Sequence, residues 1–410
     1  MSFDVSQIYA AHTAWLDAAE AGKTYSRLAR LLEHAKLNVP FYQTLQMDLQ
    51  KLPLLEKKHY QETPAELCTV DTQAAAHLLK TSGTTGAPLQ VNLDWLAWYT
   101  VNFGFFNQIA ELANLPNELF QGKKLAVLFV SNKPNRASFV LPLPALQDSL
   151  YARVQLPEDC HRTRAVMEKM QAPILYGKPS YLLDLRAAMI AAGCSRAPWS
   201  PALLLSSGET LYGDDSACLQ EFFGAPIIDA LASTEGGLIA ARVPGEQGYQ
   251  VLHENVHLEV LDSEGRVSTS GCGELILTNL VYQNTVFIRY RSGDYAELST
   301  GANGQQVLSQ LFGRDPASLN FGGITVPVSA LAQTFERIPG LLDYQITASA
   351  GAETCLRWMH DVACGIPNQH VLAALTEKFQ KTLPHVRFSC LQVEQLTAKG
   401  GKKRRYLQSN

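Results

Sequence analysis

Between residues 123 and 233, short apolar runs alternate with helical segments, and this pattern constrains the fold more than any other part of the sequence. The apolar runs predict buried strands at 123–132, 172–177, 201–207 and 225–233, and the stretches between the later runs predict helices at 180–193 and 214–224. Strands and helices in this order form a parallel sheet with crossover helices. Ligands usually bind at the carboxyl ends of such strands. The segments after Ser206 and Ala232 are therefore candidate site loops.

The pattern differs on both sides of this region. The earlier part predicts helices, including one at 25–37 that Pro40 ends. Beyond about residue 248 the chain predicts short strands without helices, typical of a β-meander or a small barrel. Beyond about Gly313 it predicts strands around one helix at 368–383. We therefore predict an α/β protein. Its large domain, at 1–312, has parallel sheet, crossover helices and a β-barrel-like subdomain, and a small mobile α+β domain follows at 313–410.

The composition argues against several classes of protein. The 410 residues are 46% hydrophobic and carry a net charge of −4, so nothing global indicates a nucleic-acid partner. No run is long and apolar enough to span a bilayer, and the acidic first segment lacks the features of a secretory signal. The eight cysteines are scattered without a C-x-x-C pair. We expect a cytoplasmic protein with reduced thiols that binds neither membrane nor nucleic acid.

A loop rich in hydroxyl groups and glycines follows the apolar pair at 78–79. It consists of Thr81, Ser82, Gly83, Thr84, Thr85 and Gly86. Such a loop offers backbone N–H groups and hydroxyls to phosphate oxygens, and its glycines allow the backbone to approach closely. It is not a Walker loop, because no Lys-Ser/Thr pair follows the second glycine. Taken alone, the loop suits a flexible surface turn equally well, but its position after an apolar run and before Pro88 favours phosphate binding.

Three further motifs carry charged side chains in suggestive places. Glu235 follows Thr234 at the end of a predicted strand, where a carboxylate can hold a divalent cation beside phosphates. Asp294 ends the motif RYRSGD, and the tail from Gly401 to Arg405 is strongly basic. Each motif alone also suits a plainer role, namely a solvated surface charge, an aspartate in a β-turn and a solvated basic tail.

With these motifs in this order, nearly the whole chain resembles the superfamily of acyl-CoA synthetases, carrier-loading adenylation domains and luciferases. Four stretches, at 31–45, 175–185, 251–260 and 288–294, are similar to the phenylacetate-CoA ligase family. That family builds aryl-CoA thioesters, so the resemblance implies an aromatic acid as substrate. It also implies ATP, Mg²⁺ and coenzyme A, or the phosphopantetheine of an acyl carrier protein, as cofactors. Members of this family often pair, which implies a possible homodimer.

The resemblance assigns a role to each motif. It implies that the loop at 81–86 holds the ATP phosphates, that Glu235 binds Mg²⁺ and that Thr234 contacts the α-phosphate. It further implies that Asp294 holds the ribose hydroxyls and that Arg314 contacts ribose or phosphate. The catalytic cation would be Lys402, with Lys399 and Lys403 as rival assignments. The remaining expected contacts are Ser207, Gly208 and Glu209 at the adenine or acyl edge, and Gly323 beside the pantetheine channel.

Two departures from the family pattern are expected to matter. Leu231 and Ala232 stand where the family usually has a Tyr-Gly pair, which should alter the floor of the adenine or acyl pocket. Pro316 stands at the family's hinge position, with Asp315 one residue early. Because proline fixes φ, rotation there should be restricted or shifted to a neighbour.

The expected reaction is activation of a carboxylic acid as acyl-AMP with release of pyrophosphate, followed by transfer to the thiol of coenzyme A. Two alternatives remain open. One is an aryl acid ligase that loads a carrier protein, and the other is a relative that binds nucleotide or an aryl ligand without catalysis.

Overall fold

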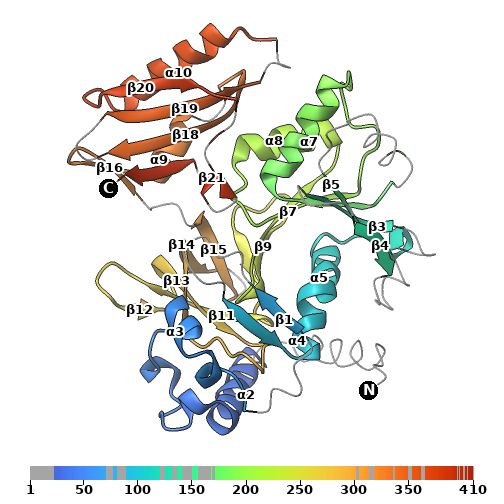
Figure 1. The fold of residues 1–410 in the computed structure, drawn as a ribbon, viewed down its shortest axis with the longest axis vertical. Coiled ribbons are helices and arrows are strands. Elements are labelled where there is room, and N and C mark those ends of the chain that lie inside the picture. Colours follow the sequence, from blue (N-terminus) through green and yellow to red (C-terminus); the bar gives the residue numbers. More distant parts are fainter. Residues whose placement is uncertain are drawn as a thin grey trace.

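The computed structural model describes most of the chain after its first 22 residues. The described residues are 23–70, 77–80, 89–120, 125–131, 136–140, 150–155, 168, 171–301, 304–313, 318–335, 338–349, 353–361, 365–394, 396, 398–399, 402–403 and 405–409. Figure 1 shows a broad sheet with helices on its faces and, above it, a separate C-terminal group of strands and helices.

Thirteen strands of the described chain form one sheet. They lie in the order β12-β11-β13-β14-β15-β10-β9-β8-β7-β6-β3-β5-β4. Their bounds are β3 (Leu125–Ser131), β4 (Arg136–Val140), β5 (Leu150–Gln155), β6 (Ile174–Gly177), β7 (Leu203–Ser207), β8 (Ile227–Ser233), β9 (Gly237–Arg242), β10 (Tyr249–Val251), β11 (Val256–Leu261), β12 (Val267–Ser268), β13 (Gly271–Asn279), β14 (Tyr290–Thr300) and β15 (Gln306–Gly313).

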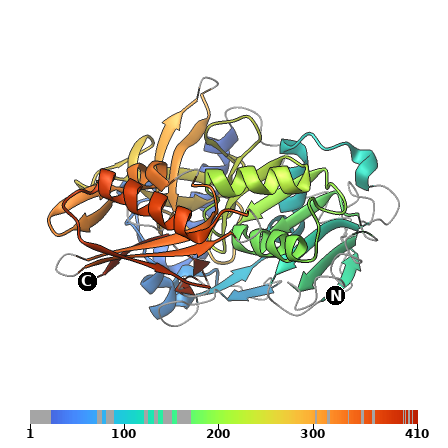
Figure 2. The ribbon, with the colours of Figure 1, turned by 90° about the horizontal axis from the view of Figure 1, so that it is seen from above.

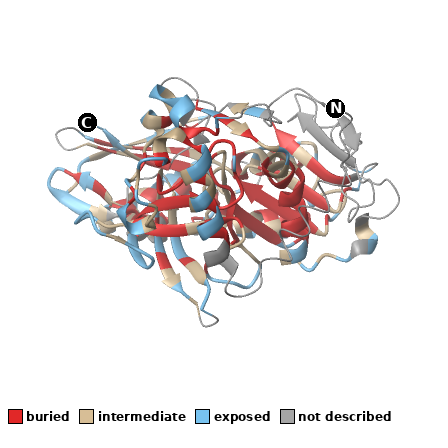
Figure 3. Ribbon diagram, turned by 90° about the horizontal axis from the view of Figure 1, so that it is seen from below, coloured by how far each residue is buried: buried red, intermediate tan, exposed pale blue. Residues whose placement is uncertain are grey.

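The parallel part of this sheet confirms the α/β prediction. Strands β5, β3, β6, β7 and β8 pair in parallel, and α7 (Pro179–Ala191) and α8 (Gly213–Phe223) are the crossover helices. Side chains alternate between the two faces of a strand. Leu204 therefore packs in the core beneath α7 and α8, while Leu203 and Leu205 pack with α5 (Phe105–Leu112) on the other face. Figure 3 shows buried residues concentrated in the interior of the molecule, and β6, β7 and β8 are buried along most of their length.

The strands from β10 to β15 pair antiparallel with one another and remain in the same sheet. The connection is β10, which pairs with β9 on one side and β15 on the other. The region predicted as a meander or barrel is thus continuous with the parallel strands.

The first described part of the chain covers the segment that leads into β14. It contains α2 (Lys23–Asn38), α4 (Trp95–Tyr99), the hairpin of β1 (His77–Lys80) with β2 (Gln90–Leu93), and α3 (Lys57–Glu62). Leu31, Ala35 and Tyr60 pack in one buried cluster with Phe287 and Tyr290. The helix predicted at 25–37 is confirmed as part of α2.

The C-terminal unit has a sheet and a core of its own. It contains β16 (Ser318–Phe321), β17 (Ile324–Pro327), α9 (Val328–Phe335), β18 (Leu341–Ser349), β19 (Thr354–His360), α10 (Asn368–Thr382), β20 (Phe388–Gln392), β21 (Ala398–Lys399), β22 (Lys402–Lys403) and β23 (Tyr406–Ser409). Its four-stranded sheet has the order β20-β19-β18-β23 and packs through Trp358 against Phe335 and Phe379. In Figure 2 this unit lies to one side of α7 and α8. We propose that the boundary between domains 1–312 and 313–410 falls at the end of β15.

None of the helices in the described part of the chain is long and apolar enough to cross a membrane.

Candidate active site

The carboxyl ends of β6, β7 and β8 lie beside one another at one edge of the sheet. The register pairs Gly177 with Ser206, and Ser207 with Ala230. Two predicted site segments, Ser207–Glu209 and the turn after Ser233, therefore start from adjacent strands. Gly208 adopts a φ of +88°, a left-handed conformation that favours glycine and turns the chain away from β7.

Glu209 is held by the start of α7. Its Oε1 lies 3.3 Å from Nζ of Lys178, and its Oε2 accepts a hydrogen bond of 3.3 Å from the backbone N–H of Ser180. The Glu209 side chain is only 6% exposed. A carboxylate at a helix N-terminus is favoured by the helix dipole and by the unpaired N–H groups there. The structure thus gives Glu209 a role in fixing the loop, in addition to the ligand contact predicted from the sequence.

Thr234, Glu235 and Gly236 form the tight turn between β8 and β9. Two side chains from outside the turn fix its shape, and close packing restricts its third residue to glycine. The amide of Asn279 donates to the carbonyl of Glu235 at 2.9 Å, and the hydroxyl of Tyr282 donates to the carbonyl of Thr234 at 3.1 Å. A Cβ on Gly236 would lie 2.7 Å from the side chain of Ile239, so no larger residue fits there without movement. The predicted metal ligand therefore lies on a well-supported turn.

The carboxylate of Glu235 is buried and hydrogen-bonded. Glu235 is 7% exposed, and its Oε1 accepts from the hydroxyl of Tyr290 at 3.1 Å. The ring of Tyr290 makes edge contacts with Tyr60 and Phe287, at centroid distances of 5.6 Å and 5.3 Å. These contacts hold the phenol in place, so that its hydroxyl orients one carboxylate oxygen. The other oxygen is the candidate ligand for a cation.

Asp294 follows an irregular stretch at the start of β14. The register with β13 shifts between Arg291 and Tyr295, and Gly293 has a φ of +76°. Glu274 holds this stretch, because it accepts from the backbone N–H of Gly293 at 3.2 Å and from Arg291 at 2.6 Å and 3.0 Å. Asp294 is half-buried at the end of the stretch.

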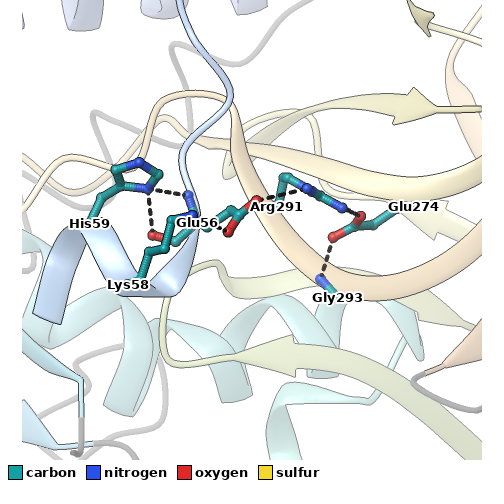
Figure 4. A network of polar contacts seen from close by, with 6 residues as sticks. All are labelled: Glu56, Lys58, His59, Glu274, Arg291 and Gly293. Atoms are coloured by element: carbon teal, nitrogen blue, oxygen red, sulfur yellow. Dashed lines mark hydrogen bonds and ion pairs between the residues drawn. The ribbon is translucent and has the colours of Figure 1, made fainter. Parts of the chain in front are cut away.

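Arg291 also reaches the N-terminal part of the chain. Its Nη1 donates to Glu56 at 2.8 Å, so that it lies between Glu56 and Glu274 (Figure 4). The pKa of Arg291 is raised above its ordinary value, mainly by its hydrogen bonds to Glu274. The backbone of Leu55 bonds to the residues on both sides of Tyr290. Its N–H donates to the carbonyl of Arg289, and its carbonyl accepts from the N–H of Arg291. The stretch that carries Tyr290 and Asp294 is therefore fixed from both sides.

The C-terminal candidates lie on two short hairpins. Gly323 lies in the exposed turn between β16 and β17, with a φ of +100°, and its N–H donates to Asn320 at 2.8 Å. Lys402 is in β22, where it is the register partner of Lys399 in β21, while Lys403 pairs with Ala398. All three candidate lysines thus belong to one hairpin, and Figure 1 shows β21 on the side of the C-terminal unit that faces α8.

Some predicted site residues lie outside the described residues. These are Thr81, Ser82, Gly83, Thr84, Thr85, Gly86 and Arg314, and also Asp315 and Pro316 at the predicted hinge. Gly313, which precedes Arg314, is described, and a Cβ on it would lie 3.2 Å from the hydroxyl of Thr210. The end of β15 is therefore next to the loop that follows β7.

Several residues that support the site were not singled out from the sequence. Tyr290 and Arg291 belong to the motif RYRSGD, but only Asp294 of that motif received a role. Asn279 and Glu274 carry no local signal, since their partners are distant in sequence.

No family model matches the sequence, and no curated protein matches it. Solved structures do match. A 2-hydroxyisobutyryl-CoA ligase in the postadenylation state, in complex with R3-HIB-AMP, has a TM-score of 0.74 at 18% identity over 96% of this chain and 90% of that chain. The same ligase in complex with 2-HIB-AMP and CoA in the thioesterification state has a TM-score of 0.55 at 19% identity, over 95% and 90%. The chain has the fold of the adenylate-forming acid–CoA ligases.

Two further solved structures share this fold at lower similarity. The anthranilate CoA ligase AuaEII, in complex with anthranoyl-AMP, has a TM-score of 0.53 at 17% identity, over 80% of this chain and 64% of that chain. The acetoacetyl-CoA synthetase from Streptomyces lividans has a TM-score of 0.52 at 16% identity, over 82% and 55%. The fold class predicted from the sequence is confirmed by these matches.

A buried carboxylate lies beneath the site. Asp229 on β8 accepts a hydrogen bond from the hydroxyl of Tyr249 and lies 3.7 Å from Arg242. Burial raises the pKa of Asp229 to about 6, although both partners lower it. Asp229 thus binds its proton more tightly in the folded protein than in the unfolded chain.

This raised pKa predicts a pH dependence of stability. A carboxyl group with a raised folded-state pKa contributes stability that is present in full below the usual aspartate pKa and is lost as pH rises through about 6. From about pH 4 to about pH 7, the free energy of unfolding of the wild type, relative to Asp229→Asn, should fall by up to ~1.4 kcal/mol per pH unit. Urea unfolding of both proteins across this range measures the difference.

The control is Asp262→Asn. Backbone and side-chain hydrogen bonds from Arg266 lower the pKa of Asp262, so its contribution should be lost as pH falls, which is the opposite direction. Equal slopes for the wild type and Asp229→Asn would contradict the raised pKa of Asp229.

Proposed function

We propose that this chain activates a carboxylic acid with ATP as acyl-AMP, releasing pyrophosphate, and then transfers the acyl group to the thiol of coenzyme A, releasing AMP. The observation that supports this most is the shared fold, over nearly the whole of both chains, with a 2-hydroxyisobutyryl-CoA ligase bound to an acyl adenylate. A second support comes from the motif residues that the structure describes, because Ser207, Thr234 and Glu235 lie at the ends of adjacent strands or in the turns that follow them.

Glu235 suits a magnesium ion that also binds ATP. Mg²⁺ in such sites takes one or two carboxylates together with substrate phosphates, and among the described residues no group of three ligating side chains forms a separate metal site. A bound Mg²⁺ would neutralise charge on the phosphates. In this proposal Tyr290 orients Glu235 towards the ion, and Thr234 contacts the α-phosphate.

We assign the other nucleotide contacts to the remaining motif residues, as the resemblance implies. We assign the phosphates to the loop of Thr81, Ser82, Gly83, Thr84, Thr85 and Gly86, and the ribose to Asp294 and Arg314. Ser207, Gly208 and Glu209 border the adenine or acyl group, and Lys178 keeps this loop in place through Glu209. Gly323, in its exposed turn, allows the pantetheine of coenzyme A to approach closely.

The hairpin of β21 and β22 provides the cation for the transition state. When the carboxylate attacks the α-phosphorus, negative charge increases on the oxygens around it. A lysine ammonium is a compact charge that stabilises such oxygens directly. We assign this role to Lys402.

The substrate that we propose is an aromatic acid, on the resemblance to phenylacetate-CoA ligases. One structural neighbour is an anthranilate CoA ligase, whereas others are a 2-hydroxyisobutyryl-CoA ligase and an acetoacetyl-CoA synthetase. A substrate panel must therefore include aromatic, hydroxylated and short aliphatic acids.

Acid-dependent release of pyrophosphate from MgATP tests the proposal. We expect release with an aromatic acid and formation of a thioester when coenzyme A is added. Thioester formation with a carrier protein and not with free coenzyme A would identify a carrier-loading ligase instead. A folded protein that binds ATP but releases no pyrophosphate with any acid would be a non-catalytic relative.

Replacing Lys402 tests the catalytic assignment. Loss of one transition-state contact costs about 2.7–4 kcal/mol, so Lys402→Ala should slow acyl-AMP formation roughly 100-fold or more while ATP binding is retained. Lys399→Ala and Lys403→Ala are matched controls on the same hairpin. A larger loss in either control would transfer the role to that lysine.

Replacing Tyr290 tests the orientation of Glu235. Tyr290→Phe keeps the ring contacts with Tyr60 and Phe287 but removes the donor to a carboxylate, and such bonds are worth about 1.5–3 kcal/mol. Acyl-AMP formation should fall about 10- to 100-fold, most strongly at low Mg²⁺. Tyr282→Phe, which removes a donor to the neutral carbonyl of Thr234, should have a smaller effect. Equal effects of the two variants would argue that Tyr290 only supports the turn.

A further inference from the structure

A buried arginine, Arg405, joins the two parts of the molecule. Arg405 is 8% exposed and lies between carboxylates from both parts. Its Nη2 donates to Asp215 on α8 at 3.1 Å and 3.0 Å, and its Nε donates to Asp343 on β18 at 2.7 Å. Asp215 belongs to the parallel-sheet part and Asp343 to the C-terminal unit.

Aromatic rings from both parts cover the same guanidinium. The centre of Arg405 lies 3.8 Å from the ring centroid of Tyr212 and 4.9 Å from that of Tyr344. Burial opposes the charge of Arg405, but Asp215 and Asp343 outweigh it and raise its pKa well above the ordinary value. Guanidinium groups suit such places, because they stack on aromatic faces and bind carboxylates through two N–H groups.

A second ion pair connects the same two parts. Nη1 of Arg186 on α7 lies 3.6 Å from Oδ2 of Asp361, which follows β19. Both side chains are less than one-fifth exposed, at 17% and 19%. The C-terminal unit thus contacts the pair of crossover helices at two charged points.

Arg405 lies close to the candidate catalytic lysine in the chain. It follows the hairpin of β22 by two residues and directly precedes β23, and its carbonyl accepts from the N–H of Ile346 on β18 at 2.7 Å. Its backbone is therefore fixed to the C-terminal sheet and its side chain to α8. Tyr212, on which it stacks, comes three residues after Glu209 in the loop that follows β7. The pairing brings the base of the lysine hairpin to the candidate active site.

The structural comparison indicates which arrangement of the two parts this is. Two states of one ligase match this chain with TM-scores of 0.74 for the postadenylation state and 0.55 for the thioesterification state. Because both structures are of the same protein, this difference reflects its conformation rather than its sequence. The chain thus has the arrangement closer to the postadenylation state.

We propose that Arg405 is a positioning residue that locks the C-terminal domain onto α8 in the arrangement for acyl-AMP formation, and that this lock opens before the acyl group passes to the thiol. The inference rests on the proposed function. It assigns Asp215 as the partner that holds the closed arrangement, while Asp343 keeps Arg405 attached to its own domain.

The test uses Asp215→Asn in the full-length protein. Arg405→Ala would leave the buried Asp215 and the half-buried Asp343 without their cation and is liable to unfold the C-terminal domain. Asp215→Asn instead keeps the shape of the side chain and leaves Arg405 paired with Asp343. Burial raises the pKa of Asp215 to about 6, so assays at about pH 8 compare an ionised wild type with a neutral variant. Glu221→Gln, at an exposed position of the same helix, is the matched control.

Two half-reactions are measured separately. In Asp215→Asn, acid-dependent pyrophosphate release should fall about 10- to 100-fold, because a charged hydrogen bond is lost. Thioester formation from supplied acyl-AMP and coenzyme A should be unchanged or faster. An equal loss in both half-reactions, or no loss in either, would overturn the proposal, since a merely structural residue does not distinguish between them.

Small-angle X-ray scattering tests the lock independently of enzyme activity. Asp215→Asn should have a larger radius of gyration than the wild type and Glu221→Gln, at equal thermal stability. If the wild type activates no acid but the variant still expands, the proposed function fails and the lock stands. If pyrophosphate release is normal in the wild type and the variant does not expand, the lock fails and the function stands.

Discussion

The hydrogen bond from Tyr290 to Glu235 joins the two halves of the candidate site. Glu235 belongs to the turn that ends the parallel strands, and Tyr290 begins the strand that leads to Asp294. Arg291 is held between Glu56 and Glu274, and Leu55 pairs with the backbone on both sides of Tyr290, so the segment that carries the Tyr290 hydroxyl is fixed on both sides. The N-terminal region thus helps to fix Tyr290, the hydrogen-bond donor to the residue that we assign to magnesium. Buried charges require this kind of support, since an ion pair or hydrogen bond must offset the loss of water around each of them.

Much of the parallel sheet could be predicted from the sequence, because its signals are local. Apolar runs bounded by turns produced the strands now seen as β3, β6, β7 and β8, and the helices predicted at 180–193 and 214–224 are α7 and α8 within two residues. The link between the two regions of the sheet could not be predicted. β10 has three residues and pairs with β15, more than fifty residues later, and no local pattern encodes such a pairing.

The candidate site shows the same division between local and distant information. Thr234, Glu235 and Asp294 could be proposed from the sequence because each lies in a short motif with a clear chemical reason. What holds them was hidden, since Asn279, Glu274 and Glu56 look like ordinary polar residues until the chain brings them close. Glu209 illustrates the limit of a motif, because the sequence predicts a ligand contact and the structure also engages both of its oxygens with the start of α7. A motif identifies the chemistry at a position, whereas the surrounding packing decides which atoms remain available for it.

The contact between the two parts of the molecule has a composition suited to forming and breaking. An apolar interface would be stabilised in proportion to the apolar surface that it buries. Separating its two sides would expose all of that surface to water. A buried ion pair gains less net stability, because desolvation offsets much of the attraction. Arg405 keeps one carboxylate, Asp343, within its own domain, so separation from Asp215 leaves it with a partner while both groups regain water. The stacking of Arg405 on Tyr212 restricts the orientation of the contact, because a guanidinium stacks flat on an aromatic ring. The contacts of Arg405 with Asp215 and Tyr212 are therefore specific in geometry, which suits the lock that we propose.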